Sequence, residues 1–127
     1  MQLFLNGKWR DLREKTEVLN PFDGSVIDTV PSASPAEIAA AIDGLAWGAE
    51  TMRNMPSHRR VEILRKAADL MRERQEELGR LISTEEGKVL AEGRIEAGRA
   101  IETIDLSADE ARRLHGETVP LDSTPGG

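Results

Sequence analysis

The chain has 127 residues, with 23 acidic and 17 basic side chains, a net charge of −6 and no cysteine. This length suits a single domain. The negative charge argues against a nucleic-acid partner or an anionic membrane surface, because both bind clustered Lys and Arg. Without cysteine these residues offer no disulfide, no thiolate metal site and no cysteine nucleophile. There is neither a membrane-span pattern of ~18 apolar residues nor a signal peptide, so we expect a cytoplasmic protein.

Residues 1–33 have the pattern of two β-hairpins. The first is predicted to turn at Asn6-Gly7, a dipeptide typical of the type I′ turn. The second has predicted strands at 16–19 and 25–30, separated by a run rich in Asn, Pro, Asp and Gly. Two-stranded ribbons cannot bury both faces, so we expect this region to need a neighbour.

Residues 34–116 are predicted to form helices. Ser34-Pro35-Ala36-Glu37 is a capping box with Pro at the first helical position, which predicts a helix from Pro35 to about Met52. Pro56 breaks it, and Ser57 is expected to cap the next helix. Apolar residues define the predicted faces of these two helices: Ile38, Ile42, Leu45, Ala49 and Met52 in the first, and Val61, Leu64, Ala68 and Met71 in the second.

The second helical pattern continues, with a bend near Gln75, to a predicted C-cap at Gly87. Glu62 and Lys66 have the spacing of an i,i+4 ion pair. A long helix at 90–115 is then expected to end at a Gly116 cap, and its predicted buried stripe consists of Leu90, Ala97, Ile101, Ile104, Ala108, Ala111 and His115.

Residues 117–127 are predicted to form an edge strand at Glu117–Asp122 and then a linker, since Pro120 cannot donate to a central ladder. The expected segment is therefore mostly α-helical, with short N-terminal hairpins and one C-terminal edge strand.

The residues themselves carry few signs of catalytic chemistry. Gly79 to Lys88 has the wrong spacing for a phosphate loop, and Val89 replaces the Ser or Thr that such a loop requires. His58 and His115 stand alone, without metal-ligand spacing. Ser83 and the many carboxylates lack an evident catalytic partner, so solvated helix faces explain the carboxylates better than a catalytic pair does.

Several collinear stretches resemble the opening of the aldehyde dehydrogenase superfamily. The resemblance covers essentially the whole chain, and it is carried by LFLNGKW at 3–9, VLNPFDGSVIDTVP at 18–31, SPAEIAAAI at 34–42, RRVEILRKAADLMRERQEELGRLISTEEGK at 59–88, AEGRIEAGRAIETIDLSADEARRLHGETVPLD at 91–122 and the PGG that follows. Each motif alone is weak, whereas their shared order and spacing are specific.

The resemblance implies an α/β parent fold with a domain for NAD or NADP, a catalytic domain and an oligomerisation strand. The parent would oxidise an aldehyde to an acid by cysteine attack, hydride transfer and thioester hydrolysis. The catalytic Cys, the general-base Glu, the oxyanion Asn and the cofactor-binding residues would all lie beyond Gly127. We therefore expect no cofactor and no activity for this chain alone, with the remaining polypeptide or a homo-oligomer as its partner.

The resemblance also implies one incomplete metal site and a substrate type. Some members hold a monovalent cation through backbone carbonyls before the Asn-Pro turn and a carboxylate early in the long helix. Those positions are Val18, Leu19 and Glu96, although Glu96 also suits a helix-surface carboxylate. The ETVPLD-x-x-PGG ending is similar to the branch that handles small polar semialdehydes or lactaldehyde-type substrates.

The sequence leaves two interpretations open. The chain is the N-terminal segment of an NAD(P)-dependent aldehyde dehydrogenase, or it is a stand-alone helical interaction module from a truncated gene. In either case apolar faces lack a cover, so we expect the isolated chain to be marginally stable.

Overall fold

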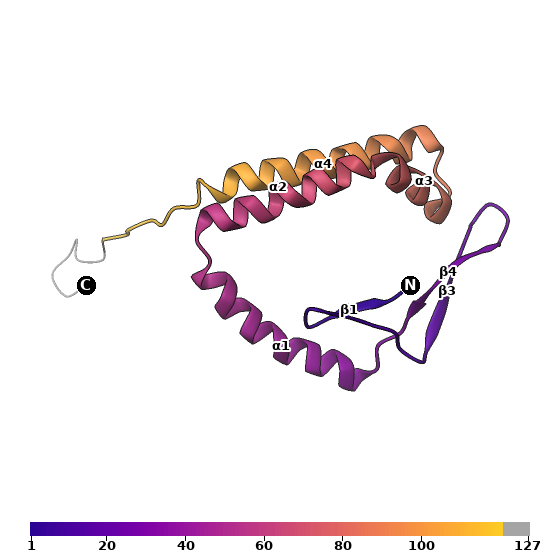
Figure 1. The fold of residues 1–127 in the computed structure, drawn as a ribbon, viewed down its shortest axis with the longest axis horizontal. Helices are drawn as coiled ribbons and strands as arrows, with labels where there is room; N and C mark the ends of the chain where they lie inside the picture. Colours follow the sequence, from indigo (N-terminus) through magenta and orange to yellow (C-terminus); the bar gives the residue numbers. More distant parts are fainter. Residues whose placement is uncertain (121–127) are drawn as a thin grey trace.

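The structure, a computed structural model, describes residues 1–120 as two separate β-hairpins followed by four helices (Figure 1). The elements in chain order are β1 (Leu3–Leu5), β2 (Lys8–Arg10), β3 (Lys15–Leu19), β4 (Val26–Pro31), α1 (Pro35–Asn54), α2 (Ser57–Glu73), α3 (Gln75–Glu86) and α4 (Leu90–Ala111). The prediction of a mostly helical segment that begins with two hairpins is confirmed. None of the described helices is both long and apolar enough to cross a membrane.

The first hairpin turns where the sequence predicts. β1 pairs antiparallel with β2, with Leu5 opposite Lys8. Asn6 has φ 50° and Gly7 has φ 76°, so both central residues lie in the left-handed region that a type I′ turn requires. Phe4 and Trp9 sit opposite each other with ring centroids 5.0 Å apart, and this aromatic pair stabilises the ribbon.

The second hairpin pairs β3 with β4 and carries an irregularity between Val18 and Leu19. Its loop is stabilised from within, because the Asn20 carbonyl accepts the amide of Gly24 at 2.8 Å. The Asp23 carboxylate accepts hydrogen bonds from both the amide and the hydroxyl of Ser25. These bonds lower the pKa of Asp23, since they stabilise its ionised form.

The helix α1 begins at the predicted capping box and then leaves its apolar face uncovered. Ser34 Oγ accepts the amide of Glu37, while the Glu37 carboxylate accepts the amide of Ser34. No residue of α1 is buried. Two side chains tie the helix to its surroundings: Asn6 donates to the Ala40 carbonyl at 3.0 Å, and Arg60 donates to the Met52 carbonyl at 2.5 Å.

The other three helices form a packed unit. α2 and α4 run side by side in opposite directions, and α3 folds against the start of α4 (Figure 1). The hydrophobic core of the described chain lies on α2 and α4, and most of its residues are small: Val61, Ala68, Ala97, Ile101, Ala108 and Ala111. The predicted stripe of the long helix is confirmed at Ala97, Ile101, Ala108 and Ala111, whereas His115 is exposed.

Glycines set the distance between α3 and α4. A Cβ added at Gly93 would lie 2.4 Å from the carbonyl oxygen of Gly79, and one added at Gly79 would lie 3.0 Å from the Cα of Arg94. Backbone therefore meets backbone at this crossing. Even a methyl group would force the two helices apart.

Two predictions about the second helix are wrong, and one about the third is right. Ser57 is the first residue of α2 rather than its cap, because Pro56 occupies the N-cap position and no side-chain hydrogen bond caps the helix. Glu62 pairs with Arg59 at 2.5 Å, three residues before it, instead of with Lys66. The Gly87 cap, in contrast, is confirmed: Gly87 has φ 70° and its amide bonds to the Ser83 carbonyl.

The end of the long helix also differs from the prediction. α4 stops at Ala111 instead of reaching Gly116. Ala111 is its last buried residue, and every described residue after it is exposed, so no packing sustains another turn. Residues 117–120 belong to no strand, since a strand needs a ladder partner; Leu121, Asp122 and the predicted linker lie outside the described residues.

Candidate functional site

The polar side chains considered as nucleophiles or ligands serve structural roles. Ser83 Oγ donates to the Lys88 carbonyl at 2.6 Å, and Thr84 Oγ1 donates to the Arg80 carbonyl at 2.8 Å. His58 and His115 are exposed, and the His115 ring lies 2.9 Å from the Arg113 carbonyl. Within residues 1–120, no three His, Cys, Asp or Glu side chains gather as a metal site would require.

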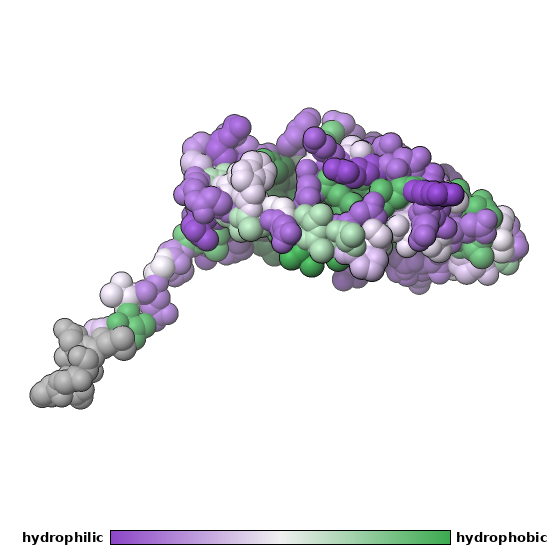
Figure 2. Space-filling model, turned by 90° about the horizontal axis from the view of Figure 1, so that it is seen from below, coloured by the Kyte–Doolittle hydropathy of each residue, from purple (hydrophilic) through white to green (hydrophobic). Residues whose placement is uncertain are grey.

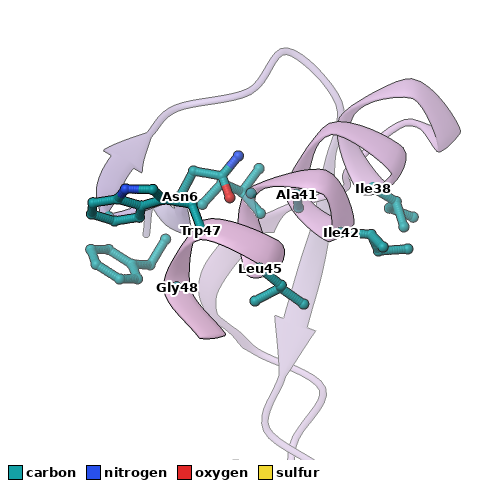
Figure 3. A pocket seen from close by; sticks show the side chains of 11 residues that line it. Asn6, Ile38, Ala41, Ile42, Leu45, Trp47 and Gly48 are labelled. Carbon is teal, nitrogen blue, oxygen red and sulfur yellow. The ribbon is translucent and has the colours of Figure 1, made fainter. Parts of the chain in front are cut away.

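A large apolar groove lies between the first hairpin and α1 (Figure 3). Its volume is about 690 Å³, and its lining residues are Phe4, Leu5, Asn6, Gly7, Ile38, Ala41, Ile42, Gly44, Leu45, Trp47 and Gly48. Within this lining only Asn6 and Trp47 have side chains that can form hydrogen bonds. The Asn6 amide already donates to the Ala40 carbonyl. The groove has no catalytic group, so it is suited to packing.

Exposure along α1 supports that role. Ile42 is 60% exposed, Leu45 67% and Trp47 77%. Apolar side chains gain roughly 25 cal/mol for each Å² removed from water, so a face of this kind favours a covering partner. Figure 2 shows hydrophobic surface on the side of the molecule viewed from below, with hydrophilic residues around it.

An ion-paired cluster lies at the turn between α3 and α4. Lys88 Nζ lies 2.6 Å from Glu86 Oε2 and 2.5 Å from Glu96 Oε2. The hydrogen bond that Lys88 donates to Glu86, and then the one to Glu96, raise the pKa of the ammonium above its ordinary value. Lys88 therefore stays positively charged throughout the physiological range.

Of the predicted cation ligands, Glu96 lies at this turn, and Val18 and Leu19 precede a loop that reaches it. Val18 and Leu19 end β3, and the loop that follows them reaches α3, because a Cβ on Gly87 would lie 2.8 Å from Pro21 Cγ. Glu96 lies on α4, where its carboxylate accepts from Lys88. The Lys88 ammonium, which Glu86 and Glu96 share, already occupies one oxygen of Glu96, and the site at Val18, Leu19 and Glu96 stays a prediction.

Reasoning from the sequence missed the part that Lys88 plays. A usable signal is present, since the lysine stands two residues after Glu86 and directly after the glycine that reverses the chain. A side chain at that point can reach both the helix that ends and the helix that begins.

A second set of ion pairs ties α2 to α4. Asp105 accepts from Arg65 at 2.6 Å and also from Arg72, while Arg65 reaches Asp109 at 2.5 Å. The Asp105 side chain is 23% exposed, so these bonds are partly shielded from water. They hold two helices in register and leave no open position for a substrate.

Comparison with known proteins identifies the origin of this arrangement. Residues 9–126 match the aldehyde dehydrogenase family. The chain belongs to the aldehyde dehydrogenase family. A 3-sulfolactaldehyde dehydrogenase from Priestia aryabhattai is 40% identical over 125 residues, which are 98% of this chain and 26% of that protein.

Solved structures of the family show the same fold over this segment. Aldehyde dehydrogenase 21 from Physcomitrella patens, in complex with the reaction product succinate, matches with a TM-score of 0.91 and 32% identity over 97% of this chain and 26% of its own. An NADP-dependent glyceraldehyde-3-phosphate dehydrogenase from Bacillus halodurans, complexed with NADP, matches with a TM-score of 0.90 and 34% identity over 99% of this chain and 27% of its own.

The chain thus spans about a quarter of the length of the relatives that it matches. Two of the solved relatives use nicotinamide cofactors: a benzaldehyde dehydrogenase from Corynebacterium glutamicum is NAD-dependent, and the Bacillus halodurans enzyme is complexed with NADP. The resemblance read from the sequence motifs is confirmed as membership of the aldehyde dehydrogenase family.

Proposed function

We propose that this chain forms the N-terminal part of an NAD(P)-dependent aldehyde dehydrogenase that oxidises an aldehyde to a carboxylic acid. The observation that carries the proposal is the collinear match of residues 9–126 to the family, which comes with 97% coverage of this chain by the Physcomitrella patens structure. NAD or NADP, when bound to the whole enzyme, accepts the hydride that the aldehyde loses. Residues 1–127 contain no cysteine, so they supply no thiolate nucleophile.

In this proposal the chain contributes packing rather than chemistry. The helices α2, α3 and α4 form a packed unit, whereas α1 and the first hairpin present the apolar groove. The groove's partner would be the remaining polypeptide of the same enzyme, or another subunit of a homo-oligomer. Covering Ile42, Leu45 and Trp47 would remove the apolar surface that the isolated chain exposes.

The substrate that the proposal favours is a short aldehyde that carries an acidic group. This follows from two relatives: the Priestia aryabhattai enzyme is named for 3-sulfolactaldehyde, and the Physcomitrella patens enzyme holds succinate as its product. Both molecules are small and anionic.

The deciding experiment measures the native gene product in its source cells. An antibody raised against the chain would isolate that product for intact-mass measurement and for an assay with NAD or NADP and succinate semialdehyde. We expect a mass roughly four times the 14.0 kDa of this chain, since the chain covers 26% of its relative, together with reduction of the cofactor.

The purified 127-residue chain is the matched control, and it should reduce neither cofactor. Turnover by this control would contradict the assignment of catalysis to other residues. A native product near 14.0 kDa without activity would instead support the alternative, a stand-alone helical interaction module. That alternative is favoured by one observation, the exposed apolar face of α1, which a partner protein could cover.

A further inference from the structure

The turn between α3 and α4 holds an ammonium group between two carboxylates. Lys88 Nζ lies 2.6 Å from Glu86 Oε2, at the end of α3, and 2.5 Å from Glu96 Oε2, on α4. The three side chains are only partly exposed, at 34%, 49% and 45% for Lys88, Glu86 and Glu96. A positive charge thus sits where carboxylates from two helices converge.

The backbone around Lys88 is fixed, so the position of its charge is not accidental. Gly87 adopts φ 70°, a conformation that side chains rarely take, and its amide caps α3. The Lys88 carbonyl accepts from Ser83 Oγ at 2.6 Å. Pro21 from the second hairpin packs against Gly87, which leaves no room for a Cβ there. The lysine stem therefore starts from a point that the end of α3 and the loop of the second hairpin both hold in place.

An ammonium group and a monovalent metal cation would compete for the same carboxylate oxygens at such a site. Na⁺ and K⁺ bind oxygen ligands, and a carboxylate supplies the negative charge that favours binding. Lys88 offsets one of the two carboxylate charges at this site and contacts an oxygen of each carboxylate, and a second cation bound to Glu96 would be repelled by the ammonium nearby.

We propose that the Lys88 ammonium is the resident cation of the Glu86–Glu96 site, in place of the monovalent metal ion that the resemblance implies at Glu96. Two consequences follow. The native chain does not bind Na⁺ or K⁺ at Glu96, and removal of the ammonium alone opens the two carboxylates to such an ion. This inference rests on the geometry of residues 83–96 and does not depend on the proposed catalytic function.

The test compares the wild-type chain with Lys88→Met, a variant of similar length that lacks the charge. Thermal unfolding would be followed in NaCl, KCl and choline chloride at equal ionic strength, together with the ²³Na NMR linewidth during a titration. For the wild type we expect the same Tm in all three salts and no saturable line broadening. For Lys88→Met we expect saturable broadening and a Tm roughly 5 °C higher in about 200 mM NaCl than in choline chloride.

Two further variants make the result specific. Lys66→Met removes an exposed lysine from α2 and should behave like the wild type in every salt. Lys88→Met combined with Glu96→Gln should lose the response to Na⁺, because the carboxylate that binds the ion is gone. Saturable Na⁺ or K⁺ binding by the wild type would overturn the proposal, and so would a folded Lys88→Met chain without a cation response. The wild-type titration decides the matter even if Lys88→Met does not fold.

Discussion

The helices α1 and α4 are similar in length, at 20 and 22 residues, and both carry an apolar stripe at helical spacing. In α4 the stripe is buried against α2 and α3, whereas in α1 no residue is buried. The two stripes differ in their side chains: α4 presents Ala and Gly with Ile101, while α1 presents Ile38, Ile42 and Leu45.

This contrast separates two meanings of an amphipathic pattern. A stripe of small residues lets a neighbouring helix come close, so the single layer of helices in this segment is enough to bury it. A stripe of large residues needs a partner of matching depth, and the described residues hold none for α1. The periodicity of a sequence shows which side of a helix faces a partner, and the size of the side chains on that side indicates how deep the covering layer must be.

The largest loss of stability should come from adding a methyl group at the contact between α3 and α4. In Gly93→Ala the new methyl group would lie 2.4 Å from the Gly79 carbonyl oxygen, so we expect a loss of roughly 2–3 kcal/mol in the free energy of unfolding. The matched control is Gly48→Ala in α1, which meets no atom within 4 Å and should gain up to about 1 kcal/mol from helix propensity. Urea unfolding followed by circular dichroism measures both, and equal effects would contradict the contrast between the two helices.

A smaller loss of stability is expected when a shortened side chain leaves a cavity in the core. Val61 is 3% exposed and packs in the core with Ala108 and Ala111, so Val61→Ala should cost about 1–2 kcal/mol. Ile42→Ala removes more atoms from a side chain that is 60% exposed, and it should change stability by less than about 0.5 kcal/mol. If denaturant unfolding showed that Ile42→Ala costs as much as Val61→Ala, then α1 would be covered in solution.

The ion pairs between α2 and α4 provide a third comparison. Asp105→Asn removes the charge that both Arg65 and Arg72 contact, and we expect the Tm to fall by roughly 2–5 °C. Asp69→Asn breaks only a pair within α2, with Arg72, at a side chain that is 59% exposed. This control should shift the Tm by less than about 1 °C. Scanning calorimetry measures both Tm values, and an equal Tm for the two variants would contradict the role of the pairs between α2 and α4.

The smallest effect concerns pH. The hydrogen bond from Arg94 lowers the pKa of Glu76 below its ordinary value of 4.5, so the folded state binds this proton more weakly than the unfolded state. The contribution to stability is fully present above about pH 4.5 and is lost as the pH falls through the folded pKa. Unfolding measured from pH 7 to pH 2 should show a shallower acid decline for Glu76→Gln than for the wild type.

Local rules were sufficient for most elements. The type I′ turn at Asn6-Gly7, the capping box at Ser34 and the Gly87 cap all depend on bonds within a few residues, and the structure confirms them. The same rules failed at Gly116 and at the predicted edge strand. A helix end and a strand both depend on what lies beside them, and residues 112–120 have no packing that would extend α4.

The candidate sites were harder to predict for a related reason. The sequence predicts that α1 has an apolar face, and the structure adds that Phe4 and Leu5 of the first hairpin complete a groove beside it. The role of Lys88 depends on where Glu96 falls one turn or more along the next helix, and that depends on the angle of the turn at Gly87. Sequence spacing alone does not give that angle.

The meeting of Gly93 with Gly79 also limits how this part of the chain can evolve. In most helix contacts a larger side chain on one helix is accommodated when its neighbour becomes smaller. At this crossing each position is already glycine, and a methyl group at either one would meet backbone atoms of the other helix, so no smaller neighbour exists to compensate. Selection should therefore remove single substitutions at either glycine. The sequence of the exposed face of α1 is constrained only by whatever partner covers it.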